Sequence, residues 1–403
     1  MSPTTDVRSA RTAVALVFGL NGFVFASWMS RIPVARDALG LSPGQLGLLL
    51  LALSVGSVSG LPVAGALVDR FGTARVVAVA SALVATGLVG ASWGATVVES
   101  VPLTAVFLCV MGFGVGTWDV AMNLEGADVE RELGRTIMPR FHAAFSLGTV
   151  VGAGGGAAAS ASGLGLFPHL LVACVVMLAI VQTSVRSFLP TGREVPAGED
   201  DPATERRSPL AAWLEPKTLM IGLMVLALAL TEGTANDWLA VALVDGYDLP
   251  AWGGAAGFAA FVTAMTVGRM LGTGLLDRFG RVPVLWATMA TAGVGVLVTV
   301  FSPWLPLAIV GVCLWGLGAS LGFPVGMSAA ADDPRGAAAR VSVVSTIGYT
   351  AFLAGPPFIG FVAEHVGTLD ALLVVAIMLV PSALVVPAAR ERVSPSSSAA
   401  RTG

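Results

Sequence analysis

Charged residues are scarce in this chain of 403 residues, and lysine occurs only once, as Lys217. Asp, Glu, Lys and Arg together make up 12% of the sequence, whereas a water-soluble domain carries about 25%. Hydrophobic residues reach 55%, and the mean hydropathy is +0.84. This balance excludes a water-soluble globule. We also expect no nucleic-acid partner, because the sequence has no basic patch with interleaved aromatic residues.

Cysteine and histidine are rare too, with three of each. Cys109, Cys174 and Cys313 fall in different hydrophobic segments, so we interpret them as packing residues and expect neither a disulfide framework nor a metal cluster. The histidines form no pair at metal-ligand spacing, and no serine stands in a Gly-flanked nucleophile elbow. These absences disfavour an enzyme, such as one acting on lipids inside the membrane, and we expect no cofactor and no metal.

Long apolar runs dominate the sequence, and we count twelve of roughly 20 residues, the length that an α-helix needs to cross a bilayer. Runs such as 46–53 do not alternate polar with apolar residues, as the strands of a membrane barrel would. The sequence predicts an all-α integral membrane protein with twelve transmembrane helices. The expected spans are 12–35, 43–68, 75–97, 101–124, 140–161, 166–189, 217–243, 251–276, 283–302, 305–328, 340–364 and 368–389.

The basic residues predict the orientation of these helices. With the N-terminus in the cytoplasm, 19 of the 22 Lys and Arg residues fall in cytoplasmic segments, and the exceptions are Arg31, Arg36 and Arg269. This bias follows the positive-inside rule. The first apolar run lacks a small-residue cleavage pattern, so we interpret it as a span and not as a signal peptide. We expect a multi-pass protein of the bacterial inner membrane with both termini in the cytoplasm.

One polar segment divides the chain into two parts. Residues 190–216 combine acidic and basic side chains with Pro, Gly and Ser, a composition that cannot bury enough apolar surface to fold. We predict an N-terminal six-helix bundle over 1–189, a cytoplasmic linker over 190–216, a C-terminal six-helix bundle over 217–390 and a disordered tail over 391–403.

The two predicted bundles repeat each other. Asp69-Arg70-Phe71-Gly72 recurs as Asp277-Arg278-Phe279-Gly280 at an offset of 208 residues. Gly112 matches Gly316 at an offset of 204. Two six-helix repeats joined by a linker are the architecture expected of a transporter that rocks its halves about a central site.

Together with the twelve spans, these two loops resemble the major facilitator superfamily over nearly the whole chain. In such a loop the carboxylate can cap a helix N-terminus while the arginine pairs across the half, although an ordinary positive-inside turn is an alternative. The resemblance implies a gate latch made of Asp69, Arg70, Asp277 and Arg278. The first loop departs from the family because Thr73 and Ala74 follow it, where a basic residue is usual.

Four further stretches resemble one branch of that superfamily, a branch of bacterial membrane proteins that includes rhizopine-type transport proteins, whose solutes are inositol derivatives. The stretches are Arg31-Ile32-Pro33, Leu39-Gly40-Leu41-Ser42, Asp119–Asn123, and Phe141-His142 followed by Phe145-Ser146-Leu147-Gly148. The resemblance implies a small polar organic solute.

Ionisable residues inside the expected spans are the sharpest clue to a site, because a charge at the bilayer centre costs at least about 2.5 kcal/mol. Asp119 and Asn123 share a helix face, as do Glu232 and Asn236, and we expect both faces to point at a central cavity. A carboxyl group removed from water can take up and release a proton near neutral pH. We assign proton coupling to Glu232 first and to Asp119 second, with a structural carboxyl group as the alternative for each.

Three basic residues have two interpretations each. Arg269 pairs either with Glu232 or a substrate anion, or else with Asp277 as a structural partner. Arg31 either snorkels to the membrane interface or lines the cavity. His142 is assigned to the gate, with a satisfied helix cap as the alternative.

Amide and aromatic residues complete the candidate site, because sugars and cyclitols are held by amide and carboxylate hydrogen bonds beside an aromatic face. The candidate substrate-binding residues are Asn21, Trp28, Arg31, Trp118, Asn123, Asn236, Trp238, Arg269, Trp315 and Tyr349.

The leading functional hypothesis is a secondary active transporter that moves a small organic solute by alternating access, coupled to protons. We expect it to work as a monomer in the lipid bilayer. A proton-driven exporter of drugs or natural products is one alternative, although the span 140–161 lacks the proline of the Gly-Pro signature that such exporters in the superfamily typically carry. A non-transporting membrane receptor on a carrier scaffold is the other.

Overall fold

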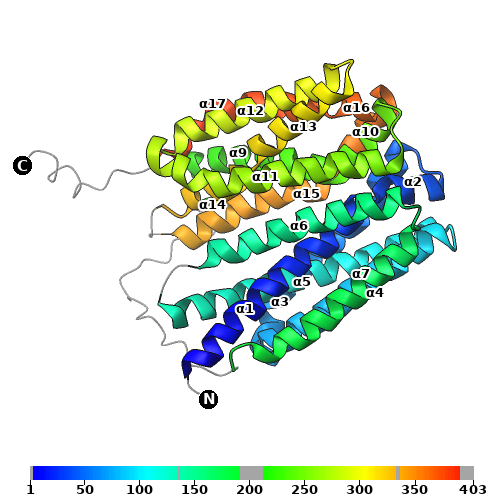
Figure 1. Ribbon diagram of the computed structural model, residues 1–403. Helices are drawn as coiled ribbons and strands as arrows, with labels where there is room; N and C mark the ends of the chain where they lie inside the picture. Colours follow the sequence, from blue (N-terminus) through cyan, green and yellow to red (C-terminus); the bar gives the residue numbers. More distant parts are fainter. Residues whose placement is uncertain (1–2, 135–136, 191–211, 333–335, 391–403) are drawn as a thin grey trace, which may run out of the picture.

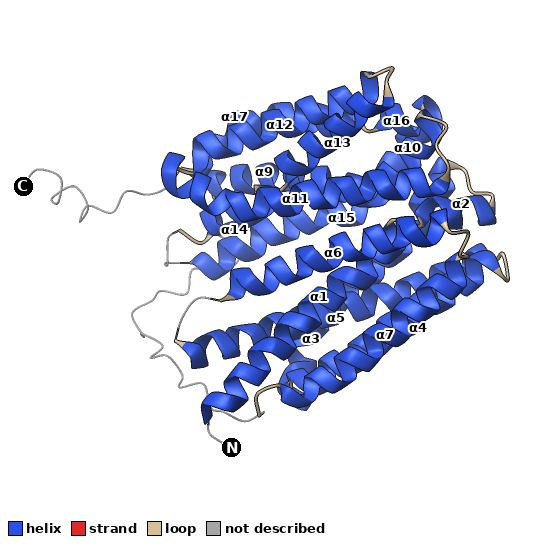
Figure 2. Ribbon diagram, viewed as in Figure 1, coloured by secondary structure: helices blue, strands red, loops and turns tan. Residues whose placement is uncertain are grey.

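The computed structural model describes residues 3–134, 137–190, 212–332 and 336–390. Every regular element in these ranges is a helix, as Figure 2 shows, so the predicted all-α fold is confirmed. The predicted linker and tail fall mostly on residues 191–211 and 391–403, which lie outside the described residues.

Six long helices form the N-terminal half. Two short elements accompany them: α2 (Ile32–Leu39), which follows α1, and η1 (Val185–Ser187), which follows α7. The expected span 12–35 is interrupted, because α1 ends at Met29 and α2 starts afresh, with Pro33 in its first turn, where no backbone donor is needed. The long helices are α1 (Pro3–Met29), α3 (Pro43–Phe71), α4 (Thr73–Thr96), α5 (Val101–Leu133), α6 (Met138–Ala161) and α7 (Leu166–Ser184).

The C-terminal half is more broken. The expected span 217–243 contains a π-helical turn, and the span 305–328 is split between two helices. The elements are α9 (Pro216–Thr234), η2 (Ala235–Leu239), α10 (Ala240–Gly246), α11 (Ala251–Phe279), α12 (Arg281–Phe301), α13 (Leu305–Ala319), α14 (Gly322–Ala330), α15 (Ala337–Val366), α16 (Thr368–Ala371), α17 (Leu373–Val385) and η3 (Val386–Ala389).

Eleven helical stretches in the described part of the chain are long and apolar enough to cross a membrane. The twelfth transmembrane helix is α6, whose 24 residues suffice for a crossing but are rich in glycine and alanine. In Figure 1, α6 lies between α1 and α11, and it packs against both. The low hydropathy of α6 comes from the small residues that permit this packing, and its outer face remains exposed at Leu147 and Val151.

Glycines bring α6 and α1 together. A Cβ atom added at Gly148 would lie 1.9 Å from the Gly19 carbonyl oxygen, and one added at Gly152 would lie 2.2 Å from that of Phe23. Only glycine permits this approach. By contrast, a Cβ atom at Gly154 would meet nothing within 4 Å.

The two halves meet mainly through two helix pairs, α6 with α11 and α3 with α15, and also through α2, which contacts α10 and α11. Figure 1 places α2, α10 and α16 together at one end of the bundle, which we call the α2 end. The opposite end carries the loops Asp69–Gly72 and Asp277–Gly280, and we call it the DRFG end.

Candidate functional site

An ion pair lies where the two halves meet. Arg269 on α11 places Nη2 2.9 Å and 3.1 Å from the two carboxylate oxygens of Glu232 on α9. The side chains are 25% and 18% exposed, so both charges are largely removed from water and each neutralises the other. Two interpretations of Arg269 were open, pairing with Glu232 and pairing with Asp277. The structure shows the pairing with Glu232.

A proline explains a second contact of Arg269. Pro324 in α14 has no N–H group, so the carbonyl of Ser320, four residues earlier, lacks its usual helical donor. Arg269 Nε donates to that carbonyl at 3.3 Å. The break between α13 and α14 thus supplies an acceptor that holds the guanidinium in place.

The same arginine reaches into the other half. Nη1 of Arg269 donates to Ser146 Oγ on α6 at 3.3 Å, and Thr266 Oγ1 donates to the Ser146 carbonyl at 3.4 Å. His142, one turn along α6 from Ser146, lies close enough to Arg269 for electrostatic repulsion and packs edge-on to Phe18 at 5.3 Å. Glu232, Arg269 and Ser146 therefore form a polar connection between the halves, which we call the central network.

The π-helical turn η2 reorganises α9 directly after Glu232. The N–H group of Ala235 bonds the Glu232 carbonyl and leaves the Thr231 carbonyl to accept from Trp315 Nε1 at 3.1 Å. Trp315 also packs edge-on against Phe261, with ring centroids 5.6 Å apart. In this state Trp315 is fully buried, so its role in substrate binding stays a prediction.

Asp119 lies in α5 and carries no basic partner among the described residues. Asn123 Nδ2 donates to its carbonyl oxygen at 2.8 Å and lies 3.4 Å from its carboxylate. Tyr349 lies on α15, in the other half. Phe323 and Phe352 flank Tyr349, with ring centroids 6.3 Å and 6.5 Å away. The structure thus brings the predicted Asp119 and Asn123 together, and a place for Tyr349 in the same site stays a prediction.

The remaining predicted substrate-binding residues are buried in this state. Most of their polar atoms have no hydrogen-bond partner among the described residues, including the side-chain amide nitrogen of Asn21 and three indole nitrogens. Their roles stay predictions that require the halves to move apart. The buried residues are Asn21, Trp28, Trp118, Asn236 and Trp238.

Arg31 has a structural environment of its own. Its side chain is only 2% exposed and donates to the carbonyls of Gly156 at 3.3 Å and Leu164 at 2.9 Å. Gly156 lies near the C-terminal end of α6, where the negative end of the helix dipole favours a cation, and Leu164 lies in the loop that follows α6. Arg31 therefore joins the turn between α1 and α2 to α6 and the loop after it in this state, and its contact with substrate stays a prediction.

The two ends of the bundle differ in how the halves are joined. At the α2 end, Arg36 bonds both carboxylate oxygens of Asp245, at 2.5 Å and 2.7 Å, and Glu364 accepts from the Gly44 N–H group at 2.8 Å. At the DRFG end the gating residues are exposed, and no described residue hydrogen-bonds to their side chains; Arg70 and Arg278 lie over Phe71 and Phe279. The latch role of Asp69, Arg70, Asp277 and Arg278 stays a prediction.

Glu125 is a buried acid that the sequence reasoning missed. It is 1% exposed and accepts hydrogen bonds from Thr73 Oγ1 at 2.5 Å and from the Leu189 N–H group at 2.7 Å. The sequence held one signal for this acid, which was the threonine at position 73, where the family usually has a basic residue. Like a basic residue, a buried threonine hydroxyl needs an acceptor nearby, and Glu125 is that acceptor. Within the described residues no group of three or more His, Cys, Asp or Glu could hold a metal ion.

Two helical halves that meet at a polar network define a membrane transporter scaffold. Residues 14–272 and 253–402 match the model of the Major Facilitator Superfamily, and the chain belongs to this family. An MFS-type transporter of Yersinia pestis is 32% identical over 88% of this chain and 89% of its own length. The membrane protein MosC of Rhizobium meliloti is 28% identical over 90% and 86%.

A solved structure has the same fold. A variant of the nucleoside transporter NupG superposes with a TM-score of 0.76 at 15% sequence identity, covering 94% of this chain and 99% of that one. The resemblance to the superfamily and to the branch that includes MosC is therefore confirmed.

Proposed function

We propose that this protein is a proton-coupled secondary transporter for a small organic solute, acting as a monomer in the bacterial inner membrane. The observation that carries the proposal is the central network, in which Arg269 neutralises Glu232 and at the same time bonds Ser146 of the other half. Protonation of Glu232 removes the partner of Arg269 and frees its guanidinium. Because the same guanidinium holds the halves together, a proton at this position changes the contact between them.

Asp119 is the better placed acid for loading a proton in this state. Glu232 has a cation within 3 Å, whereas the described contact of the Asp119 carboxylate is the Asn123 amide, at 3.4 Å. An uncompensated carboxylate inside a membrane protein is costly, so Asp119 takes up either a proton or a donor group of the solute. Tyr349 and its aromatic neighbours provide the flat face on which a sugar or cyclitol ring stacks.

The positive-inside bias supports a cytoplasmic DRFG end. With that orientation, the outer end is joined by the Arg36–Asp245 and Gly44–Glu364 contacts, while the side chains of the four residues at the inner end make no hydrogen bond to any residue that the structure describes. We infer an inward-facing state. In the outward-facing state the contacts at the α2 end break, and Asp69, Arg70, Asp277 and Arg278 form the latch.

A solved structure with the same fold supports the chemical class of the substrate. NupG is described as a nucleoside transporter, and nucleosides, sugars and cyclitols share ring hydroxyl groups that suit amide and carboxylate partners. We therefore propose a small polar solute with several hydroxyl groups.

The test begins with a binding screen, because a ligand raises the apparent stability of the protein that it binds. Purified protein is heated with myo-inositol, glucose, uridine, alanine or tetraphenylphosphonium. The solute that stabilises it is then used, radiolabelled, in proteoliposomes with and without an imposed pH gradient. We expect a hydroxyl-bearing binder and gradient-driven accumulation.

The variants Asp119→Asn and Glu232→Gln should lose gradient-driven accumulation, and the exposed Asp370→Asn should keep it. Accumulation by the unaltered protein that ignores the pH gradient would reject proton coupling. Binding without counterflow exchange would identify a receptor, and stabilisation by tetraphenylphosphonium alone would favour the drug exporter.

A further inference from the structure

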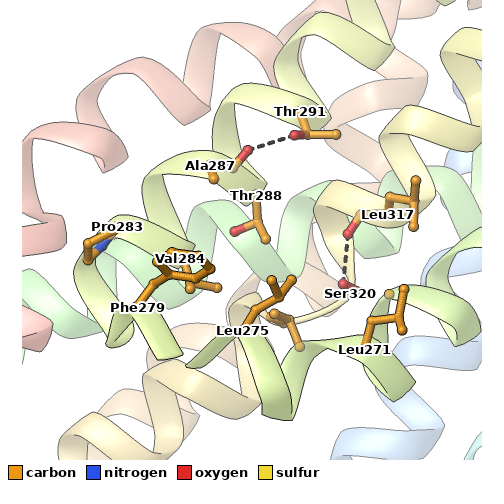
Figure 3. A pocket seen from close by; sticks show the side chains of 12 residues that line it. Leu271, Leu275, Phe279, Pro283, Val284, Ala287, Thr288, Thr291, Leu317 and Ser320 are labelled. Carbon is orange, nitrogen blue, oxygen red and sulfur yellow. Dashed lines mark hydrogen bonds between the residues drawn. The ribbon is translucent and has the colours of Figure 1, made fainter. Parts of the chain in front are cut away.

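A cavity of about 450 Å³ opens between α11, α12 and α13, and its lining includes Ser320, whose carbonyl accepts a hydrogen bond from Arg269. Figure 3 shows Leu271, Leu275 and Phe279 following one another along α11, with Ala287 and Thr291 opposite them on α12. The α11 residues are between 44% and 60% exposed. Large apolar side chains of a transmembrane helix with such exposure face the lipid, so the cavity is open to the membrane.

The polar groups of the cavity do not call for a polar ligand. The Thr291 hydroxyl donates to the Ala287 carbonyl and the Ser320 hydroxyl to the Leu317 carbonyl, both at 2.7 Å, as the dashed lines in Figure 3 mark. Thr288 likewise donates to Leu285, at 3.0 Å. With these hydroxyl groups satisfied by their own helices, the surface left for an occupant is apolar.

The length of the cavity matches one leaflet of a bilayer. Its lining runs along α11 from Gly268 to Phe279, which is about 16 Å at 1.5 Å per residue. Half of the hydrocarbon core is about 15 Å thick. An acyl chain that enters at Phe279 therefore ends near Gly268.

A cation stands where that chain would meet its head group. The Arg278 guanidinium lies 5.1 Å from the centroid of the Phe279 ring, and Phe279 lines the cavity. Arg278 is exposed, and no described residue accepts a hydrogen bond from it. A guanidinium binds phosphate through paired N–H donors.

We propose that this cavity binds a glycerophospholipid, with one acyl chain along α11 and the lipid phosphate at Arg278. The apolar lining, the length of the cavity and the exposed cation at its mouth each match one part of that ligand. The inference is independent of the transported solute.

Photocrosslinking in nanodiscs tests the site. The probes are a phosphatidylglycerol and a diacylglycerol, each with a diazirine on one acyl chain, and crosslinks on residues 268–291 are quantified by peptide mass spectrometry. Arg278→Gln should lower labelling by phosphatidylglycerol about fivefold, the effect of one basic group near a membrane surface. It should leave labelling by diacylglycerol unchanged.

The repeat supplies a matched control, because Arg70 lies over Phe71 in the same manner, at 5.3 Å. Arg70→Gln should not change labelling of residues 268–291. Ala287→Phe fills the cavity and should lower labelling by both probes. If that variant does not fold, Thr291→Leu fills part of the cavity with a smaller side chain and should have the same effect.

Three results would overturn the proposal. Equal losses in Arg70→Gln and Arg278→Gln would mean that the lipid responds to surface charge in general. Unchanged labelling in both cavity-filling variants would place the acyl chain elsewhere. Equal labelling of the unaltered protein by the two probes would show that the phosphate is not recognised.

Discussion

Thr73 and Arg281 occupy equivalent positions in the two halves, 208 residues apart, but they bind acids in different ways. Thr73 donates its hydroxyl to the buried Glu125 at 2.5 Å, whereas Arg281 lies 2.6 Å and 2.7 Å from the carboxylate oxygens of Asp332. The loop that lacks the usual basic residue is thus held by hydrogen bonds to a buried acid, and its counterpart is held by an ion pair.

Removing the acid should destabilise the first half. Glu125→Ala leaves the Thr73 hydroxyl and the Leu189 N–H group without an acceptor, and each unsatisfied buried group costs about 1–3 kcal/mol. We expect a loss of that order or more in unfolding by dodecyl sulfate in mixed micelles. Glu99→Ala is the control, because Glu99 is exposed and should change stability by no more than about 0.5 kcal/mol. Equal losses in both variants would contradict the buried role.

The pairing of Glu232 with Arg269 should appear in a double-mutant cycle. Arg269→Gln leaves a largely buried carboxylate without its cation, at a cost of about 3 kcal/mol in unfolding. The double variant Glu232→Gln/Arg269→Gln removes both charges and should be less damaged than the sum of the single variants. Additive losses in the same unfolding experiment would mean that the two charges do not stabilise each other.

Of two glycines on α6, only one should be sensitive to the same substitution. Gly152→Val places atoms against the Phe23 carbonyl, where even a Cβ would be 2.2 Å away, whereas Gly154 faces open space. Forced overpacking costs about 1–3 kcal/mol, so Gly152→Val should lower the melting temperature and the monodisperse yield on size exclusion. Gly154→Val should leave both near the unaltered values, and a reversed order would refute the α1–α6 contact.

The ion pair at the α2 end should bias the conformational equilibrium. Arg36→Gln removes two hydrogen bonds to Asp245 and so destabilises the state in which this end is joined. Spin labels at the exposed positions Asp37→Cys and Asp370→Cys, in a background without the native cysteines, report the separation of the halves there. We expect the long-distance population to grow about threefold, since a partly exposed ion pair contributes about 0.2–1 kcal/mol. An unchanged distance distribution would show that the pair does not hold this end.

Arg36→Lys is the matched control for that measurement. Lysine keeps the charge but offers a point cation in place of the paired guanidinium donors. Its effect should therefore lie between those of the unaltered protein and Arg36→Gln.

The transmembrane helices and the duplication of the halves follow from the sequence alone. A run of about 20 apolar residues is a local property, and no alternative to a helix satisfies its backbone inside a bilayer. The interruptions of the helices near Pro33 and Pro324 were not predicted, because the expected spans 12–35 and 305–328 ran through them. Both prolines are visible in the sequence.

The partners of the polar groups were decided by tertiary structure. The residues showed that Arg269 needs an acid, but only the rotation of α11 against α9 determined that Glu232 and not Asp277 supplies it. Ser146 entered the network because α6 and α11 come from different halves and touch. In a membrane protein, helix faces turned to lipid and to other helices are both apolar, so the pattern of hydrophobic residues does not report rotation. That rotation decides which polar atoms meet.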